Sequence, residues 1–287
     1  GSKEGDFIFG KPNDVNTLLY YLGNATELTL PANYNGENYV IGANVFNGNT
    51  SLTSVVIPNS VTSIGEYAFY NCTGLTSVEF NAENCTTMGS SSYLVFSGCT
   101  ALSTVTIGEN VKTIPDYAFP GCIGLTNVVI PNSVTSIGAS AFEGCANIEN
   151  LYISNSLESI GEKAFAGCEK IMDIKIGLEK PIRGAANIFA DTVYDNATLY
   201  IPNGTEQLYQ KREPWNLLFY IAEMDFTGID EVLDEVKAES GTNGRRPEGL
   251  KAKMKAIYDL NGRAVEKPAK GIYIINGKKC WVSESND

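Results

Sequence analysis

Hydrophobic residues recur along the chain at intervals of 23 to 27 residues. One copy reads Val-Thr-Ser-Ile-Gly-Glu-Tyr-Ala-Phe-Tyr-Asn-Cys at 61–72, and Leu-Thr-Ser-Val-Glu-Phe follows at 75–80. Residues 133–138 repeat residues 60–65 letter for letter. A fixed period of this length is typical of a solenoid built from stacked copies of one unit. The copies are marked by Phe46, Phe69, Phe96, Phe119, Phe142, Phe165 and Phe189.

Each copy predicts the same short elements. The apolar alternation at Val128 and Ile130 predicts a strand with one buried face, and Pro131 ends that strand because proline cannot donate to a ladder. Residues 134–137 predict a second extended piece, and the near-helical spacing within 141–145 predicts about one helical turn. One copy cannot bury its apolar face alone, so stacked copies share a core. The expected fold is an α/β-type but mostly β repeat solenoid, a right-handed leucine-rich repeat solenoid with repeats of about 23 residues.

Two columns of the repeat predict the core. Three residues after the marker phenylalanine, a cysteine recurs in successive copies, and Cys85 takes a slot equivalent to that of Val61. Stacked parallel side chains have Cβ atoms that point the same way, which is poor disulfide geometry, so we expect buried free thiols. The spacing Cys-x-x-Cys, which would suggest zinc, does not occur. The predicted core ladder comprises Phe69, Cys72, Phe119, Cys122, Phe142, Cys145, Phe165 and Cys168.

The regular repeat covers only part of the chain. Beyond it, a stretch rich in charged residues and glycine predicts a linker, and two Asn-Gly pairs between β-prone runs are strong hairpin signals. The expected parts are a solenoid at 1–227 (degenerate first copy 7–40, regular repeats 41–190, C-terminal cap 191–227), a linker at 228–255 and a small β module at 256–287.

Three local features depart from the repeat. In the cap, we expect Thr205 to N-cap a helix that runs to Arg212. Trp215 is expected to provide bulky cover, with sugar stacking as the less favoured alternative. The copy that contains Phe96 is four residues longer, around 82–92, and we expect a tolerated surface loop there, although insertions in solenoids can carry function.

Composition and charge exclude several classes of function. The chain has 287 residues, 43% of them hydrophobic, and no histidine, so Ser-His-Asp and Cys-His nucleophiles and His-ligated metals are excluded. The net charge is −12, and no Lys or Arg occurs between Lys11 and Lys112, so nucleic acid is a poor partner. No apolar run approaches the length that spans a bilayer, so we expect no transmembrane segment.

The segment Ser-Val-Thr-Ser-Ile-Gly-x-x-Ala-Phe-x-x-Cys-x-x-Leu at 60–75, with its relatives over 40–176, resembles the BspA-like leucine-rich repeat family of bacterial surface and secreted proteins. The tail at 257–274 is similar to the sorting-domain-like β modules of exported Bacteroidetes proteins. The resemblance implies a secreted or cell-surface location, adhesion to host matrix proteins or other cells, and no catalytic residues. The polar start of the chain looks trimmed, so the missing signal peptide does not argue for the cytoplasm. Asp191-Thr192-Val193 resembles an O-glycosylation signal of such proteins.

The outward positions of the strands are the candidate binding face. If Val128 and Ile130 point inward, alternate residues form two outward columns, which gain amide, charged and tyrosine side chains toward the C-terminal copies. Tyrosine beside such groups is typical of protein or glycan contacts. The predicted contact residues are Asn127, Asn150, Tyr152, Asp173, Lys175 and Tyr200.

Two other functions stay open. A carboxylate-based glycan-active enzyme would need a close pair of carboxyl groups, for which Glu149 and Asp173 are the candidates, but a flat solvated sheet offers no pocket to raise a carboxyl pKa. A structural spacer or assembly element would need no ligand. The favoured prediction is non-catalytic binding to an extracellular protein or glycan, with no metal and no cofactor, and the sequence leaves the oligomeric state open.

Overall fold

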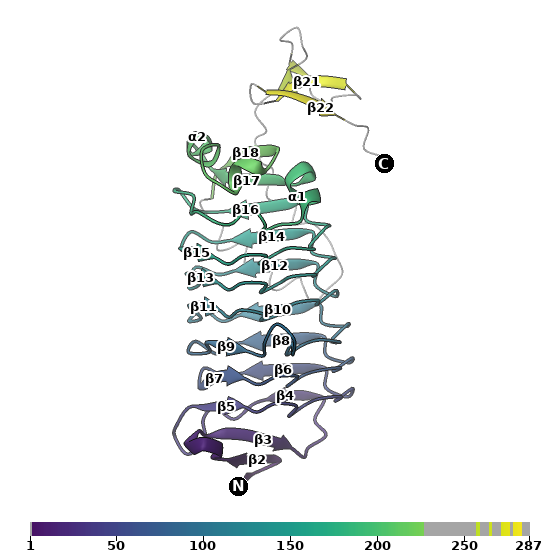
Figure 1. Ribbon diagram of the computed structural model, residues 1–287, viewed down its shortest axis with the longest axis vertical. Coiled ribbons are helices and arrows are strands. Elements are labelled where there is room, and N and C mark those ends of the chain that lie inside the picture. Colours follow the sequence, from purple (N-terminus) through teal and green to yellow (C-terminus); the bar gives the residue numbers. More distant parts are fainter. Residues whose placement is uncertain (1, 227–256, 259–263, 266–270, 276–277, 283–287) are drawn as a thin grey trace.

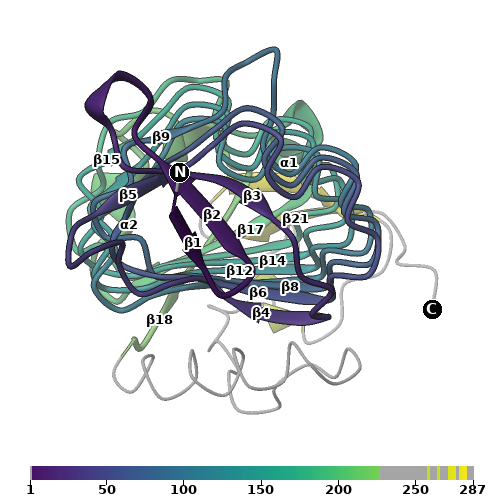
Figure 2. The ribbon, with the colours of Figure 1, turned by 90° about the horizontal axis from the view of Figure 1, so that it is seen from below.

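The computed structural model describes residues 2–226 and, further along the chain, residues 257–258, 264–265, 271–275 and 278–282. Residues 2–226 form a solenoid whose coils stack along its long axis (Figure 1). Seen along that axis, a regular coil has a side with a four-residue strand, a side with a shorter strand and a side made of turns (Figure 2). The predicted, mostly β, leucine-rich repeat solenoid is confirmed. The predicted linker at 228–255 lies outside the described residues.

The longer strands lie along one side, which we call the strand face, and pair in parallel and in register within two successive sheets. Equivalent residues of successive repeats are therefore neighbours, as Asn127 is with Asn150. The strand expected at Val128 and Ile130 is β12, and it stops at Ile130, just before Pro131, as predicted. In order along this side lie β4 (Glu27–Thr29), β6 (Ser54–Ile57), β8 (Ser77–Phe80) and β10 (Thr104–Ile107), then β12 (Asn127–Ile130), β14 (Asn150–Ile153), β16 (Asp173–Ile176), β17 (Thr198–Pro202) and β18 (Tyr220–Met224).

The second side carries shorter strands, also parallel from coil to coil. They correspond to the second extended piece expected in each copy, although several are only two residues long. In order they are β3 (Thr17–Tyr21), β5 (Tyr39–Ile41), β7 (Val61–Ile64) and β9 (Thr87–Met88), followed by β11 (Thr113–Ile114), β13 (Ser136–Ile137) and β15 (Ser159–Ile160).

The third side, the turn side, corrects the helical turn predicted within 141–145, because this stretch forms turns without an α-helix. Ser140 and Gly144 both have positive φ (53° and 74°), which a right-handed helix cannot contain. The backbone instead bonds to the next coil, as Phe119 N–H donates to Ala141 O at 2.7 Å and Phe142 N–H to Ala164 O at 2.8 Å. The turn side therefore contributes to the ladder that holds the coils together.

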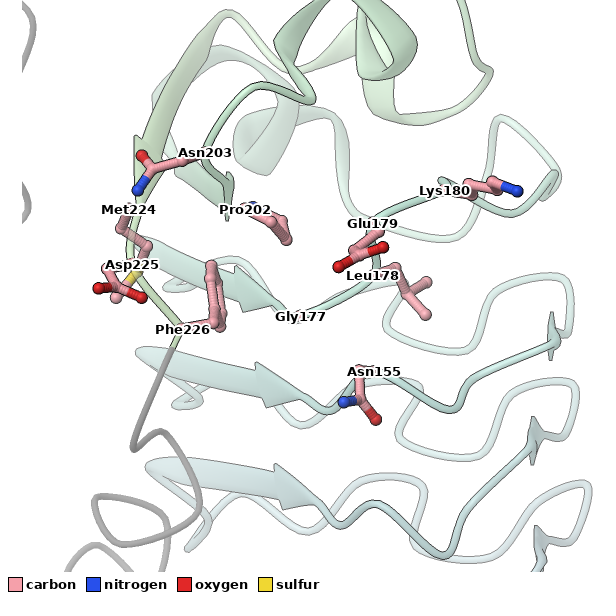
Figure 3. A pocket seen from close by; sticks show the side chains of 10 residues that line it. All are labelled: Asn155, Gly177, Leu178, Glu179, Lys180, Pro202, Asn203, Met224, Asp225 and Phe226. Atoms are coloured by element: carbon pink, nitrogen blue, oxygen red, sulfur yellow. The ribbon is translucent and has the colours of Figure 1, made fainter.

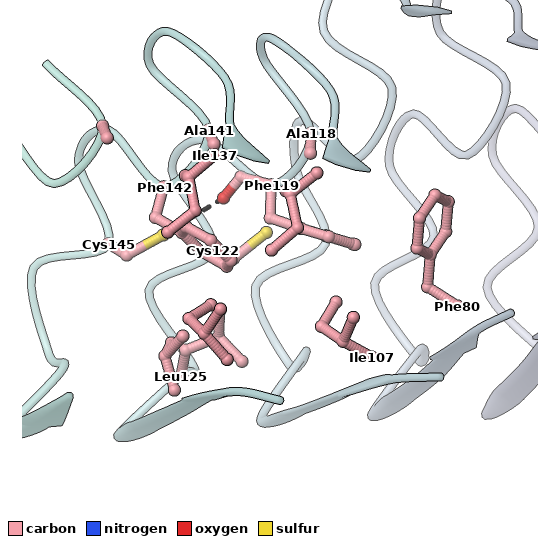
Figure 4. Packing of buried hydrophobic residues seen from close by; sticks show 14 of the residues in the cluster. Phe80, Ile107, Ala118, Phe119, Cys122, Leu125, Ile137, Ala141, Phe142 and Cys145 are labelled. Carbon is pink, nitrogen blue, oxygen red and sulfur yellow. Dashed lines mark hydrogen bonds between the residues drawn. The ribbon is translucent and has the colours of Figure 1, made fainter. Parts of the chain in front are cut away.

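The marker phenylalanines stack through the middle of the solenoid, as predicted. Their rings are buried, and neighbouring rings lie nearly parallel, with centroids 4.7 Å apart for Phe46 and Phe69 and 5.3 Å apart for Phe142 and Phe165. Figure 4 shows Phe119 and Phe142 side by side, with aliphatic side chains from the strands facing them. Rings from the ends of the chain close this stack: Tyr21 packs on Phe46 at 5.5 Å, and Trp215 packs on Phe189 at 6.1 Å.

The cysteine column lies beside the phenylalanine stack, and the six cysteines of the described coils are buried and free, as predicted. Several donate a hydrogen bond from Sγ to the carbonyl oxygen of a marker phenylalanine in the preceding coil. Cys145 Sγ, for example, lies 3.1 Å from Phe119 O (Figure 4). Burial raises the pKa of the Cys85 thiol to about 12. These thiols therefore serve as small core side chains that also bond one coil to the next.

The glycine of each Ser-Ile-Gly motif allows two coils to approach closely. A Cβ atom at Gly161 would lie 2.4 Å from Ala139 N, and one at Gly138 would lie 2.4 Å from Asp116 N. Both obstacles are backbone atoms of the preceding coil and cannot swing aside. The recurrence of glycine at this place in the repeat follows from that contact.

At the N-terminal end, an antiparallel hairpin completes the degenerate first copy. β2 (Phe7–Gly10) pairs with β3, while β1 (Ser2–Glu4) pairs with β2, and the 3-10 turn η1 (Pro12–Asp14) joins β2 to β3. Phe9 stacks on Tyr34 with ring centroids 4.4 Å apart. β4 occupies the strand position that the Leu-Thr-Leu-Pro stretch at 28–31 predicts.

The C-terminal cap corrects one expectation. Helix α2 covers Glu206–Tyr209, shorter than the predicted helix to Arg212, and Thr205 makes no side-chain capping bond. Its hydroxyl donates to Pro202 O at 2.7 Å, which holds the turn before the helix. Helix α1 (Asp191–Asn196) and the 3-10 turn η2 (Trp215–Leu217) complete the cap.

Trp215 is fully buried in this cap, with Nε1 donating to Ile182 O at 2.8 Å, so it provides the expected cover and is not a surface for sugar stacking. Thr192 is exposed on α1, and its glycosylation remains a prediction. No helix among the described residues is both long and apolar enough to cross a membrane.

The C-terminal part contains the antiparallel strand pairs that the two Asn-Gly signals predict. β19 (Ile257–Tyr258) pairs with β20 (Ala264–Val265), and β21 (Gly271–Ile275) pairs with β22 (Lys278–Val282). Together they form a four-stranded sheet in the order β20-β19-β21-β22.

Candidate functional site

The six predicted contact residues lie together on the C-terminal half of the strand face. Strand register places Asn127, Asn150 and Asp173 in one column. A second column, two residues further along each strand, contains Tyr152, Lys175 and Tyr200. The structure therefore brings together residues that lie 23 or more positions apart in the sequence.

The first column is partly exposed and internally bonded. Asn150 Nδ2 donates to Asn127 Oδ1 at 2.8 Å, which orients both side chains and leaves amide groups at the surface. Asp173 follows on β16 and is also partly exposed. Adjacent strands lie about 4.8 Å apart, so the column presents polar groups at a regular spacing.

The second column corrects an expectation, because two of its members are buried and do not face solvent. Tyr152 is 4% exposed and Lys175 is 9% exposed, while Tyr200 is partly exposed. The ammonium of Lys175 lies 4.5 Å from the centre of the Tyr152 ring, 5.6 Å from that of Tyr200 and 3.3 Å from Tyr152 Oη. The cation thus lies against two ring faces, an arrangement that offsets part of the cost of burying a charge.

The carboxyl pair considered for catalysis does not gain an apolar environment. Glu149 is exposed and Asp173 is partly exposed. Neither side chain is enclosed in the apolar pocket that the proton donor of a glycosidase requires. Among the described residues, no group of three His, Cys, Asp or Glu side chains is placed to hold a metal ion.

An open hollow of about 680 Å³ lies near the C-terminal end, where the last regular strands meet β18. Leu178 and Met224 are its buried apolar members, and Figure 3 shows Glu179 pointing toward the side of the hollow where Phe226 lies while Lys180 points away. The hollow combines the Phe226 ring, the carboxylates of Glu179 and Asp225, and apolar patches in an open setting, which fits contact with a ligand better than catalysis.

The structure reveals a second surface that sequence reasoning missed, a tyrosine cluster on the turn side formed by Tyr67, Tyr70 and Tyr93. The Tyr67 ring meets Tyr70 at 4.8 Å and Tyr93 at 5.4 Å between centroids, both edge to face. Tyr93 is 46% exposed and directly follows the inserted stretch around 82–92, and in Figure 2 the loop after β9 stands out beyond the stacked turns. The four extra residues were the available signal, but the partners of Tyr93 could be identified only once the coils were stacked.

Comparison with known proteins gives a family. The model of the BspA type leucine rich repeat region matches in 6 copies, over residues 16–94, 39–172 and 91–211. A comparison with curated proteins finds no significant match.

Similar solved structures are bacterial leucine-rich repeat proteins. A leucine rich repeat protein of T. pallidum is 25% identical, with a TM-score of 0.46, over 59% of this chain and 90% of that protein. A leucine rich cell surface protein of Faecalibacterium prausnitzii is 20% identical (TM-score 0.31, over 77% and 94% of the two chains). A leucine-rich repeat protein of Bacteroides ovatus is 15% identical (TM-score 0.23, over 78% and 90%). Because the family matches together span more than half of the 287 residues, this chain belongs to the BspA-type leucine-rich repeat family.

Proposed function

We propose that this chain is a secreted or cell-surface protein that binds an extracellular protein or glycan, without catalysis, through the strand face of its solenoid. Membership of the BspA-type family supports a binding or structural role. The observation that carries the proposal is the column of Asn127, Asn150 and Asp173, in register on three adjacent strands.

Rigidity is the physical reason that this column suits binding. The strands of Asn150 and Asp173 have ladder bonds on both sides, the strand of Asn127 pairs on one side, and the Asn150–Asn127 bond fixes two of the side chains as well. A preorganised surface loses little conformational freedom when a ligand binds, so more of the contact energy appears as affinity. Regularly spaced amide and carboxylate groups match an extended ligand, such as a peptide strand or a glycan chain.

Tyr152 and Lys175 then act beneath the contact surface. Both are buried, and Lys175 lies 5.6 Å from the centre of the Tyr200 ring. We assign them the role of holding Tyr200 in place, while the partly exposed Tyr200 touches the ligand.

The test is a binding screen of the full chain over immobilised matrix proteins, mucins and glycans. The variant Asn127→Ala/Asn150→Ala/Tyr200→Ala removes the contact groups. The matched control carries three alanines at equivalent first-column positions of the N-terminal coils, at Ser54, Ser77 and Thr104. Binding that is lost in the first variant and kept in the control supports the proposal.

Other outcomes would contradict it. If both variants bind a ligand equally well, the chain is a binding protein but the strand face is not its binding site. If the chain binds nothing at concentrations near 100 μM, which corresponds to a binding free energy of roughly −5.5 kcal/mol, the structural alternative is favoured.

One observation favours that alternative, a spacer or assembly element. The N-terminal end of the solenoid exposes Tyr20 (63%) and Leu22 (62%), side chains that end-to-end contact with another molecule would cover. Light scattering over a range of concentrations tests this: association that Leu22→Ser abolishes would support assembly, and a monomer at every concentration would reject it.

A further inference from the structure

This protein already holds an ammonium group between tyrosine rings of neighbouring coils. Lys175 Nζ lies 4.5 Å from the Tyr152 ring centre and 5.6 Å from that of Tyr200. Tyr152 belongs to the preceding coil and Tyr200 to the following one. The face of an aromatic ring carries negative charge density, which attracts a cation, most strongly where water is reduced.

The tyrosine cluster offers a second set of rings from neighbouring coils, open to solvent. Tyr67 and Tyr93 lie 26 positions apart in the sequence and meet at 5.4 Å, at an interplanar angle of 74°. Tyr70 adds a third ring at 67° to Tyr67. Because Tyr93 is 46% exposed, another molecule can reach its ring.

The polar groups around these rings favour a cation. Ser90 Oγ donates to Glu66 Oε1 at 3.1 Å, which places a carboxylate between the coils that carry Tyr67 and Tyr93. Ser91 and Ser92 are exposed beside Tyr93. Rigid tyrosines for contact area and serines for adaptable hydrogen bonds are the combination that antibody loops use.

The part of the chain around the tyrosine cluster has no basic side chain of its own that could lie on these rings. Residues 12–111 contain seven acidic residues and neither lysine nor arginine. The negative field attracts a positively charged partner and increases its rate of encounter. The side chain that would occupy these rings must therefore come from outside this stretch.

We propose that the tyrosine cluster, with Glu66, is a docking site for a cationic segment of a partner protein. A lysine or arginine of that segment lies on the faces of Tyr67 and Tyr93 while its charge is balanced by Glu66. The site lies on the turn side, away from the strand face, so it stands independently of the ligand proposed above.

The test measures binding of the full chain to a fluorescein-labelled peptide of alternating glycine and lysine by fluorescence anisotropy at low salt. The variant Tyr67→Leu/Tyr93→Leu removes both ring faces without changing any charge. We expect about tenfold weaker binding. Tyr93→Phe keeps the ring and is expected to bind like the parent. Phe219→Leu, which removes an exposed ring near the C-terminal cap, is the matched control and is expected to change nothing.

Two chemical variants of the peptide separate the role of charge from that of hydrogen bonding. Acetylation of the lysines removes their charge and is expected to abolish binding. Trimethylation keeps the charge but removes every N–H donor, so trimethylated peptide that binds the parent and loses affinity for Tyr67→Leu/Tyr93→Leu must contact the ring faces.

Three results would overturn the proposal. The lysine peptide could show no binding at concentrations up to about 1 mM, which corresponds to a binding free energy of roughly −4 kcal/mol. Binding could survive Tyr67→Leu/Tyr93→Leu and fall only with salt, which would reduce it to attraction by a chain of net charge −12. The cluster variant could lose a neutral glycan while it keeps the peptide, which would assign the rings to a different class of ligand.

Discussion

The rings of Phe142 and Phe165 lie one coil apart with their centroids separated by 5.3 Å and their planes within 2° of each other. On its other side, Phe142 faces Phe119 at 5.7 Å. Each marker ring therefore fills the space between two neighbours, and interiors of this kind are close-packed with few voids. The register of the whole solenoid depends on a side chain of this size recurring in every coil.

Removal of one central ring should therefore destabilise the protein strongly. We predict that Phe142→Ala lowers the free energy of unfolding by about 3–5 kcal/mol, because neither neighbouring coil can close the cavity alone. Phe142→Leu, which keeps most of the volume, should cost less. Urea unfolding followed by circular dichroism measures both. Ile123→Ala is the control, since Ile123 is 44% exposed, and an equal loss in Phe142→Ala and Ile123→Ala would contradict this account of the core.

The Ser-Ile-Gly motif leads to a second prediction. Gly161→Ala would place a Cβ atom 2.4 Å from Ala139 N and 2.6 Å from Ala139 Cα, so two coils must separate. We expect a loss of about 1–3 kcal/mol. Gly177→Ala is the matched control, because its nearest neighbour, Asn155 N, lies 3.4 Å away. Thermal unfolding of the two variants distinguishes them, and equal melting temperatures would show that the close approach is not limiting.

The core of this fold could be predicted from the sequence because the period places a phenylalanine in each regular coil and a cysteine three residues after it in five of them. The backbone conformation on the turn side could not be predicted, since Ser140, two residues before Phe142, adopts a positive φ that is not expected from serine. The apolar residues at 141–145 are therefore spaced as in a helix, although the chain there forms turns that hydrogen-bond to the next coil.

The candidate site was predictable in its register but not in its exposure. Strand register places Tyr152 beside Lys175, as the alternation along each strand predicts. Their burial depends on what lies beside each side chain, including the Lys175–Tyr152 contact, and no single strand encodes that. The same holds for Tyr67 and Tyr93, which become neighbours only through the stacking of two coils of unequal length.

A third prediction concerns the thiols. Cys72, Cys85, Cys99, Cys122, Cys145 and Cys168 are buried in the folded solenoid. In the native protein at pH 8 we expect iodoacetamide to leave these six cysteines unmodified, and full alkylation in guanidinium chloride, because a thiol enclosed in the core is out of the reagent's reach.

Mass spectrometry after chymotrypsin digestion reads the result for each cysteine. Trypsin is unsuitable because the stretch between Lys11 and Lys112 contains no lysine or arginine and would leave three of the cysteines on one peptide. Rapid native alkylation of Cys122 or Cys145, in the middle of the column, would contradict a closed core.

The last prediction is a loss of stability at alkaline pH. Burial raises the pKa of Cys85 from 9.0 to about 12, and it also raises the pKa of Tyr39 and of Tyr209 above the usual 10.0. The unfolded chain therefore releases these protons first, so it binds fewer protons than the folded chain above pH 9, and the free energy of unfolding falls as pH rises.

Each group contributes about 1.4 kcal/mol per pH unit within its window, which for Cys85 runs from about pH 9 to about pH 12. Cys85→Ala removes one titrating group, so its unfolding free energy should fall less steeply than that of the parent over this window. Urea unfolding at several pH values, with a reducing agent present, compares the two slopes. Parallel curves for the parent and Cys85→Ala would mean that the thiol titrates alike in both states, and burial of Cys85 could then not be the source of the alkaline loss.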